Sequence, residues 1–326
     1  MSVTIKDVAK KANVSIATVS RVLAGKKEAY ALTTEKRVNK AIQELGYKKN
    51  KTAVELVTMK SNVIAILVST PKTNFAMKII ESIQKNAYEK GLSVIILFVG
   101  DNDEETQIKA LNTVIERPVK GILLISVELC CDAINLLKNS GISNVFVSTA
   151  MSKKSKFVSS DDFQIGYEAT KFLINKGHKK IGLSSLDVDK FIGQQRLAGY
   201  LSALQEYHIP KSDDWIFEGD YSYESGVASM QYYATQTDIT AVIGTSDLAA
   251  IGIINTAQKL DIKVPSQLAV ISIDGTYLVD IVSPRVTSVT QSFYNMGATA
   301  LNMLFGEDNG DSHIYTSFKI DERESS

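Results

Sequence analysis

The pattern of hydrophobic residues changes in kind near Asn62, and this change constrains the fold more than any other feature of the chain. Before Asn62, apolar residues recur at helical spacing over short segments. After it, short apolar runs of strand length alternate with helical stretches of roughly 10–17 residues. Strands of this kind belong to parallel sheets that helices cover on both faces. We therefore expect an all-α N-terminal headpiece and a larger α/β core.

The core is expected to contain two lobes, each a doubly wound parallel sheet. The 266 residues after residue 60 suffice for two such layered lobes. No GxGxxG follows a predicted strand, so a dinucleotide site is not indicated. The predicted strands are Val63–Val68, Val94–Val99, Ile122–Ile125, Val145–Val147, Ile181–Leu183, Ala241–Ile243 and Leu268–Ile273.

The net charge of zero hides a strong asymmetry between the two parts of the chain. Residues 1–60 contain 11 Lys and 2 Arg against 1 Asp and 4 Glu, which gives a net charge of +8. The rest of the chain carries 23 basic and 31 acidic side chains, which gives −8. A basic segment ahead of an acidic remainder indicates a polyanionic partner for the first part only. Since this segment also has regular apolar spacing, we do not interpret it as a solvated lysine-rich tail.

The headpiece begins with two short helices and a tight turn. Thr4 and Asp7 form a capping-box pattern ahead of an amphipathic first helix. Asn13 tolerates the left-handed backbone of a turn, and Ser15 caps a second helix over Ile16–Leu23. A third helix follows at about residues 34–45, and Gly46 ends it. Two helices joined by a short turn, with a supporting third, predict a helix-turn-helix. A plain three-helix bundle is the alternative.

The second helix of a helix-turn-helix lies in the major groove of DNA. Arg21 can donate two hydrogen bonds to guanine, and Ile16 and Ala17 can contact a thymine methyl group. Ser15 and Thr18, at the N-terminus of this helix, suit phosphate groups. These residue types predict a surface that reads double-stranded DNA.

Three segments of the headpiece closely resemble the LacI/GalR repressor family: residues 3–9 (VTIKDVA), 14–23 (VSIATVSRVL) and 45–47 (LGY). The resemblance implies a sequence-specific DNA-binding repressor that binds a pseudo-palindromic operator as a homodimer. It implies base contacts by the second helix and phosphate contacts by Tyr47 and the capping hydroxyl groups. The expected DNA-binding residues are Thr4, Ser15, Ile16, Ala17, Thr18, Ser20, Arg21, Tyr47, Asn50, Ala53 and Leu56.

Residues 50–56 (NKTAVEL) resemble the hinge helix of the same family. The resemblance implies that this helix forms only when two subunits occupy an operator, with Leu56 wedged into the minor groove. Such a short segment is too small for a stable isolated helix, which agrees with this role. Lys49, Val54 and Ala24 depart from the family's usual proline, arginine and asparagine, so the hinge and one phosphate contact are expected to be retuned.

The core also resembles the family's sensor domain, whose fold is shared with type I periplasmic sugar-binding proteins. In that fold the chain crosses between lobes three times, which we place near residues 160, 292 and 321. The expected domains are a headpiece at 1–48, a hinge at 49–60 and a core at 61–326. The expected N-lobe covers 61–160 and 293–320, and the C-lobe covers 161–292 and 321–326. The matching segments are 177–181 (GHKKI), 196–200 (RLAGY), 219–221 (GDY), 246–252 (SDLAAIG), 264–265 (VP), 273–275 (IDG) and 323–325 (RES).

The expected effector site lies at the carboxyl ends of the parallel strands, where such sheets bind ligands. Polar residues end or follow four predicted strands, and the resemblance adds Arg196 as a donor, Tyr221 as an aromatic plate, Phe75 as an apolar wall and Gln291 as a polar contact. Such groups suit a sugar or a similar polar metabolite. Asp247 is expected to act as a structural cap instead. The predicted ligand-binding residues are Ser69, Phe75, Ser148, Arg196, Tyr221, Ser246, Asp274 and Gln291.

Other classes of protein fit the sequence less well. There is no signal segment or apolar stretch of membrane length, so we expect a cytoplasmic protein with no membrane partner. Cys130, Cys131 and three scattered histidines favour neither a disulfide nor a metal site, and no cofactor is expected. A solute-binding protein would need a signal peptide, and a hydrolase built on Asp161 and Asp162 would need a nucleophile–base pair. Control by a partner protein, and the choice between inducer and corepressor, stay open.

Overall fold

The computed structural model describes residues 3–47, 61–69, 74–100, 103–149, 155–307 and 312–326. By its internal contacts the chain divides into two compact units, Met1–Ser61 and Asn62–Ser326. The predicted hinge, with Lys49, Asn50, Ala53, Val54 and Leu56, lies outside the described residues. The two units are therefore considered separately.

The first unit is a bundle of three α-helices with one 3₁₀ turn: α1 (Ile5–Ala12), α2 (Ile16–Leu23), η1 (Lys27–Ala29) and α3 (Leu32–Leu45). Asn13 and Gly46 end α1 and α3 in the left-handed conformation, with φ values of 50° and 63°. The predicted third helix was two residues too short at its start. Leu32 is 75% exposed, so the first turn of α3 lacks the buried apolar spacing by which the sequence marks a helix.

A small hydrophobic core holds these three helices together. Val8, Val19 and Val38, one from each helix, are completely buried and belong to the same cluster. Smaller alanine side chains from α1 and α3 fill the space between them, which allows the helices to approach closely. The outer face of α2 therefore does not contribute to this core.

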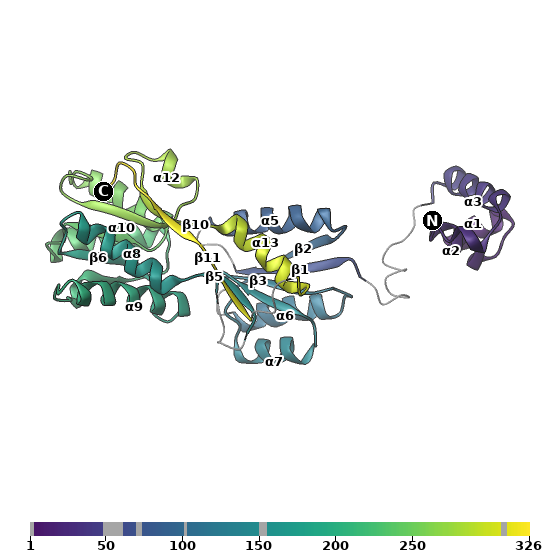
Figure 1. Ribbon diagram of the computed structural model, residues 1–326, viewed down its shortest axis with the longest axis horizontal. Helices are drawn as coiled ribbons and strands as arrows, with labels where there is room; N and C mark the ends of the chain where they lie inside the picture. Colours follow the sequence, from purple (N-terminus) through teal and green to yellow (C-terminus); the bar gives the residue numbers. More distant parts are fainter. Residues whose placement is uncertain (1–2, 48–60, 70–73, 101–102, 150–154, 308–311) are drawn as a thin grey trace. The chain divides into compact units, whose positions relative to one another are not determined.

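The second unit contains two α/β lobes, as the sequence predicted (Figure 1). The sheet of the first lobe has the strand order β11-β5-β4-β3-β1-β2, and among the described residues each pairing of neighbouring strands in it is parallel. One face of this sheet packs on α5 and α13, and the other packs on α6 and α7. The elements are β1 (Val63–Ser69), α5 (Ala76–Glu89), β2 (Ser93–Val99), α6 (Glu104–Ile115), β3 (Ile122–Ile125), α7 (Cys131–Asn139), β4 (Asn144–Val147), β5 (Phe157–Ser160), α13 (Phe293–Leu304) and β11 (His313–Thr316).

The second lobe repeats this arrangement with the strand order β12-β10-β9-β8-β6-β7. Only β12 runs antiparallel to its neighbour among the described pairings. Helices α8 and α9 cover one face, and α10 and α11 cover the other. The elements are α8 (Asp162–Asn175), β6 (Ile181–Leu186), α9 (Phe191–Glu206), η2 (Asp213–Trp215), β7 (Ile216–Glu218), α10 (Tyr223–Gln236), β8 (Ala241–Gly244), α11 (Asp247–Lys259), β9 (Ala269–Asp274), α12 (Leu278–Ile281), β10 (Thr287–Gln291) and β12 (Phe318–Asp321).

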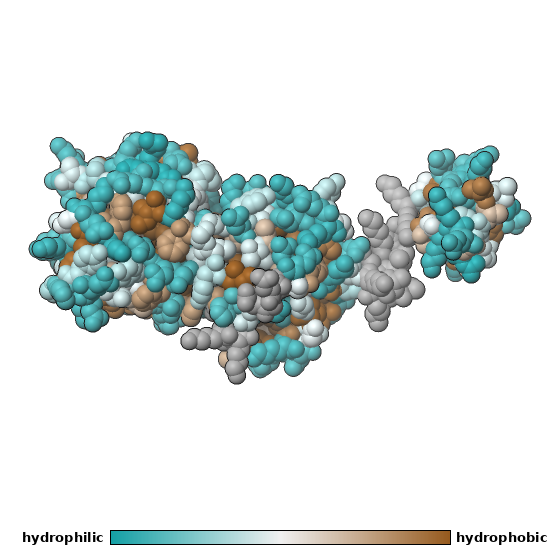
Figure 2. All heavy atoms as spheres, in the orientation of Figure 1, coloured by the Kyte–Doolittle hydropathy of each residue, from teal (hydrophilic) through white to brown (hydrophobic). Residues whose placement is uncertain are grey.

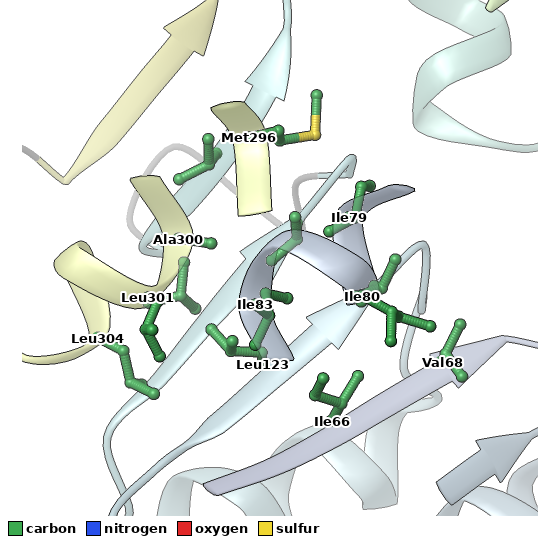
Figure 3. Close-up of a cluster of buried hydrophobic side chains, with 14 of the residues drawn as sticks. Ile66, Val68, Ile79, Ile80, Ile83, Leu123, Met296, Ala300, Leu301 and Leu304 are labelled. Atoms are coloured by element: carbon green, nitrogen blue, oxygen red, sulfur yellow. The ribbon is translucent and has the colours of Figure 1, made fainter. Parts of the chain in front are cut away.

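The interior of the first lobe is made by helices that are far apart in sequence. Figure 3 shows Ile79 and Ile83 of α5 with Leu301 of α13 above the strands that carry Ile66 and Leu123. All five side chains have no exposed surface. Because α13 returns from the second lobe, burial of its apolar face fixes the C-terminal part of the chain to the first lobe.

The chain crosses between the lobes three times. It leaves the first lobe between β5 and α8, and it returns between β10 and α13. The third crossing is at Ser317, because β11 belongs to the first sheet and β12 to the second. The sequence placed this crossing near residue 321, which assigned β12 to the wrong lobe. The reason is that β12 is a short, half-exposed edge strand without the apolar run of a central strand.

Most of the surface drawn in Figure 2 is hydrophilic, with smaller hydrophobic patches between. Among the described residues, no helix combines the length and the apolar character needed to cross a membrane. Polar residues lie at the carboxyl ends of the parallel strands in both sheets.

Candidate functional sites

One candidate site is the outer face of α2 in the first unit. Val19 and Val22 point into the core, whereas Ile16, Ala17 and Arg21 are exposed. Ile16 is 45% exposed to solvent, although an isoleucine of a small bundle would normally be buried. An exposed isoleucine, alanine and arginine on one helix face form a surface that combines apolar contact with a charged donor.

The N-terminal ends of α1 and α2 are fixed by side-chain hydrogen bonds. The Ser15 hydroxyl accepts from the Thr18 amide at 3.1 Å, and its oxygen lies 2.9 Å from the Thr18 hydroxyl. The Thr4 amide and hydroxyl both donate to the Asp7 carboxylate, at 2.8 and 2.7 Å. The hydroxyl bond from Thr4 is the main cause that lowers the pKa of Asp7. These caps set the direction in which the two helix ends face solvent.

Ser20 and Tyr47 complete the described part of the predicted DNA-binding set. Ser20 is exposed on α2, one residue before Arg21. Tyr47 follows Gly46 and packs partly against the hydrophobic core of the bundle. The structure thus places Ile16, Ala17, Ser20 and Arg21 on one helix surface, with Tyr47 beyond the end of α3.

A second candidate site is a cavity that residues of both lobes of the core line. Its empty volume is about 940 Å³ and includes space open to solvent. All eight residues that the sequence proposed for ligand binding line this cavity. They come from the carboxyl ends of β1, β4, β8, β9 and β10, from the loops at α5 and β7, and from α9. The complete lining is Ser69, Phe75, Ala76, Ser126, Glu128, Ser148, Thr149, Asp187, Lys190, Ile192, Arg196, Asp220, Tyr221, Thr245, Ser246, Asp274 and Gln291.

Arg196 is held in the cavity lining by an ion pair and by a hydrogen bond to a backbone carbonyl. Its Nε donates to Asp162 Oδ1 at 2.9 Å, and one terminal nitrogen donates to the Thr245 carbonyl at 2.7 Å. The Arg196 and Asp162 side chains are only 7% and 6% exposed. Burial raises the pKa of Asp162, and the neighbouring guanidinium opposes that shift. The pair therefore presents an oriented donor group whose charge is already balanced.

Asp274 ends β9 inside the cavity with a backbone φ of 118°, a conformation that L residues rarely adopt. Gln291 Nε2 donates to its carboxylate at 3.0 Å. Burial raises the pKa of Asp274 well above its usual range, and the nearby Asp247 adds to the shift. A carboxyl group of this kind can accept, or when protonated donate, a hydrogen bond to a ligand hydroxyl group.

Ser246 and Asp247 serve mainly to hold the walls of the cavity. The Ser246 hydroxyl donates to the Tyr221 carbonyl at 2.6 Å and accepts from the Ala249 amide at 3.0 Å, so its proton is not available to a ligand. Asp247 accepts from Ser272 Oγ at 2.7 Å and from the Thr276 amide at 2.6 Å. Asp247 is structural, as expected, but Ser246 and not Asp247 is the helix N-cap.

Three buried polar atoms of the cavity lining have no hydrogen-bond partner among the described residues: the hydroxyl groups of Ser126, Thr149 and Tyr221. Buried hydroxyl groups are normally satisfied, and a water molecule or a ligand in the cavity can supply the partner of each. Ser126 and Tyr221 also have positive φ values, 52° and 65°. Strained backbone conformations of this kind are common at ligand-binding sites.

The sequence reasoning missed the charged residues at the mouth of the cavity. Glu128 follows β3, and Lys190 precedes α9, so the two come from different lobes. Their side chains meet at 3.6 Å, and the Phe191 amide donates to Glu128 Oε1 at 3.2 Å. Glu128 lies three residues beyond a predicted strand, which was the available signal. Nothing in the sequence around Lys190 indicates that it belongs to a site.

The carboxylates of Asp161 and Asp162 have separate structural roles. Asp161 caps α8 by accepting from the Gln164 amide at 3.1 Å, while Asp162 pairs with Arg196. Their arrangement does not form the acid–base pair that a hydrolase requires. Among the described residues, no group of three or more His, Cys, Asp or Glu side chains could hold a metal ion.

Comparison with known families identifies the protein family to which this chain, with both of its candidate sites, belongs. Residues 4–50 match the family described as "Bacterial regulatory proteins, lacI family". Residues 61–305 match the one described as "Periplasmic binding proteins and sugar binding domain of LacI family". The chain belongs to the LacI family. It is a DNA-binding transcriptional regulator, with a helix-turn-helix headpiece and a sensor core of the periplasmic-binding-protein type.

Three known proteins are similar to this chain over 82% to 99% of its length. Catabolite control protein A of Priestia megaterium is 32% identical over 307 residues, which cover 93% of this chain and 92% of that protein. A transcription regulator from Lactobacillus plantarum of known structure is 40% identical, with a TM-score of 0.73, over 82% of this chain and 99% of that one. The structure of the regulator CelR in complex with cellobiose is 25% identical, with a TM-score of 0.76, over 99% and 100% of the two chains. The two solved structures are described as transcription regulators.

Proposed function

We propose that this LacI-family repressor binds a pseudo-palindromic operator in double-stranded DNA as a homodimer and that a carbohydrate in the core cavity controls the binding. The observation that carries this proposal is the coexistence of an exposed, arginine-bearing helix in a basic headpiece with a cavity of aromatic and charged residues in an acidic core. A regulator of bacterial DNA acts where that DNA is, so we place the protein in the cytoplasm.

In the headpiece, Ile16, Ala17 and Arg21 are proposed to read bases. Their exposure on the face of α2 opposite Val19 supports this role. Arg21 would donate to guanine O6 and N7, and Ile16 would pack on a thymine methyl group. The proposed phosphate contacts come from Thr4, Ser15, Thr18, Ser20 and Tyr47. The roles of Asn50, Ala53 and Leu56 in a hinge helix remain proposals from the sequence.

A homodimer is supported by exposed apolar side chains on α5 and α12. Asn74 Nδ2 donates to the Tyr277 hydroxyl at 3.3 Å, which brings the start of α5 beside the start of α12. Met77 on α5 and Ile281 on α12 are 64% and 68% exposed, and Tyr277 is 63% exposed. Exposed apolar groups gathered in this way are typical of an association surface. Two copies joined here would present two headpieces to the two halves of an operator.

A carbohydrate effector is supported by the composition of the cavity. Phe75 and Tyr221 supply aromatic surface, while Arg196, Asp274 and Gln291 supply directed hydrogen bonds. Sugars are bound by this combination of aromatic faces and polar groups. The CelR structure, which contains cellobiose, makes a sugar a reasonable ligand class for the similar core of this chain.

Control would come from the relative position of the two lobes. Since both lobes contribute to the cavity, a ligand that binds one lobe arrangement more tightly shifts the population toward it. The coupling between ligand and DNA equals that difference in binding free energy, typically about 1–3 kcal/mol. The sign of the response distinguishes an inducer from a corepressor.

The test uses the full chain. Operator sequences are first selected from a random DNA pool, and operator affinity is then measured by fluorescence anisotropy with and without a panel of sugars. We expect selection of a two-fold symmetric motif and a change in affinity with at least one sugar. Selection of no motif would contradict the DNA-binding roles. A selected motif with no response to any sugar would favour a partner protein as the controlling factor.

A further inference from the structure

Glu128 of the first lobe contacts the beginning of a helix in the second lobe. Its Oε1 accepts a hydrogen bond from the Phe191 amide at 3.2 Å. Phe191 is the first residue of α9, and Lys190, which precedes it, provides no side-chain cap for that helix. The first amide groups of an α-helix have no partner within the helix. Glu128 therefore caps α9, although it belongs to the opposite lobe.

The electrostatic environment of α9 favours this contact. The N-terminus of a helix carries a partial positive charge that attracts a carboxylate. α9 spans 16 residues and has no acidic side chain in its own first turn, so Glu128 supplies that negative charge from the other lobe. Glu128 Oε2 also lies 3.6 Å from Lys190 Nζ, and the two side chains are only 28% and 20% exposed. Partial burial reduces the screening of both interactions by solvent.

The segment that carries Glu128 is itself held in place. The buried Gln107 of α6 donates from Nε2 to the Glu128 carbonyl at 3.0 Å and accepts from the Cys130 amide at 2.8 Å. Two hydrogen bonds from one buried side chain fix the backbone on both sides of Leu129. A bond between this fixed segment and the end of a helix forms only when the two lobes have the correct relative position.

The contact between Glu128 and α9 adjoins the core cavity. Glu128 is part of the lining, and α9 contributes Ile192 and Arg196 from the second lobe. The cap therefore holds the cavity-lining turns of α9 next to the strand ends of the first lobe.

A second contact between the lobes is weaker. Asn74 Nδ2 donates to the Tyr277 hydroxyl at 3.3 Å, and the bond joins two neutral groups at an exposed position. Water competes with such a bond, whereas a hydrogen bond to a partly buried carboxylate is shorter and stronger in general. Of these two contacts, the one at Glu128 is expected to contribute more to the arrangement of the lobes.

We propose that Glu128 is a positioning residue: by capping α9 from the first lobe, it holds the core in the arrangement in which both lobes line the cavity, before any effector binds. A ligand that contacts both lobes selects this arrangement, so the population of the arrangement sets the apparent affinity for the effector. The inference goes beyond the proposed control by a carbohydrate, because it concerns the ligand-free core.

The arrangement of the lobes is measured by double electron–electron resonance on the full-length chain, without ligand or DNA. Spin labels at Asn135→Cys on α7 and Gln205→Cys on α9, two exposed positions, report the distance between the lobes. Cys130→Ser and Cys131→Ser remove the native thiols, and co-assembly with excess unlabelled chain excludes distances between subunits. We expect one dominant distance in this parent chain.

Substitutions of Glu128 should add a second component at a different distance. Glu128→Ala removes the cap, so this component should grow about fivefold relative to the parent, the factor that a typical N-cap contributes. Glu128→Gln keeps an oxygen that can accept from the Phe191 amide and should reverse part of that change. Glu116→Ala, at an exposed position of the same lobe, should leave the distances unchanged. Equal distributions for Glu128→Ala and Glu116→Ala would overturn the proposal.

Phe191→Pro tests the other partner, because it removes the donor and leaves Glu128 unchanged. Proline has no amide proton and is well tolerated at the first position of a helix. Lys190 has φ and ψ of −92° and 145°, which the residue before a proline prefers. Phe191→Pro should therefore produce the same second component as Glu128→Ala. Phe191→Ala keeps the amide and should not produce it; equal effects of the proline and alanine variants would contradict the capping role.

The double variant Glu128→Ala/Phe191→Pro distinguishes one shared bond from two unrelated effects. If Glu128 acts through the Phe191 amide, the double variant should show no more of the second component than Glu128→Ala alone. Additive effects would refute the assignment. If Glu128→Ala does not fold, the comparison of Phe191→Pro with Phe191→Ala still decides the question. Since the samples contain neither sugar nor DNA, the result does not depend on whether a carbohydrate controls the protein.

Discussion

Arg196 Nε lies 2.9 Å from Asp162 Oδ1, and both side chains are almost completely buried. The two residues belong to neighbouring helices, α9 and α8, which pack closely because a glycine at position 166 lies against the Arg196 backbone. A side chain on Gly166 would bring its Cβ to 2.2 Å from the Arg196 carbonyl oxygen. The donor that faces the cavity is therefore positioned by the packing of two helices as well as by its ion pair.

Asp162→Ala is expected to destabilise the core strongly. It leaves a buried guanidinium without its partner, and breaking a buried pair in this way costs about 3–5 kcal/mol. Thermal unfolding of the full chain should show a clear drop in Tm for the core transition. The double variant Asp162→Ala/Arg196→Met should recover much of the loss, because no unpaired charge remains. A Tm unchanged in the single variant would show that the pair contributes little.

Arg21→Ala is expected to relax the operator preference and to cost about 1–3 kcal/mol of binding to the preferred sequence. The physical reason is the loss of two hydrogen bonds to a base edge. Selection from a random DNA pool measures the preference directly. Arg37→Ala, on the exposed side of α3, removes the same charge and serves as the control. If both variants select the wild-type motif, Arg21 does not read a base.

Asp274→Ala is expected to abolish the response to the effector and to leave operator affinity in its absence intact. The carboxyl group lies in the cavity with Gln291 as its partner, and the headpiece is a separate unit of the chain. Anisotropy titrations of the operator, with and without the effector, give both quantities. Loss of operator binding by the ligand-free variant would mean that Asp274 supports the fold more than the ligand.

Asp274→Asn should stabilise the protein more at neutral pH than in mild acid. Burial holds the pKa of this carboxyl well above the ordinary value of 3.8, so the folded chain retains a proton that the unfolded chain releases. The resulting stabilisation is present below pH 3.8 and is lost as the pH rises through the raised pKa. The Tm difference between variant and wild type should therefore grow as the pH rises above about 4. A constant difference would refute this, and Asp132→Asn, an exposed position, should show no such trend.

The strongly periodic parts of the fold could be predicted from the sequence. Helices α1 and α2 carry their caps in the sequence at Thr4 and Ser15, and the central strands of both lobes are continuous apolar runs. The strands β5, β7, β10, β11 and β12 were not predicted. Phe157–Ser160 and Thr287–Gln291 are largely buried but rich in serine and threonine, so hydrophobicity does not identify them.

The cavity was predicted from two separate lines of reasoning: strand ends indicated Ser69, Ser148, Ser246 and Asp274, and family resemblance indicated Phe75, Arg196, Tyr221 and Gln291. Ser69, Asp274 and Gln291 end their strands, and strand ends converge at one edge of a parallel sheet. Glu128 and Lys190 were not predicted, because the contact between them depends on the position of one lobe relative to the other. Sequence patterns describe single elements, whereas contacts between lobes arise only from the complete tertiary structure.

The three short crossings between the lobes have a consequence for the speed of signalling. The crossing strands are neighbours within their sheets, since β5 pairs with β11 and β10 pairs with β12. A change in the angle between the lobes can be absorbed by small backbone adjustments at Asp161, Ser292 and Ser317 while both hydrophobic cores stay intact. Hinge motions of this type take microseconds to milliseconds. The core can therefore exchange between its lobe arrangements many times within a second. Because no part of it has to refold, the DNA-binding response would track changes in effector concentration without a delay.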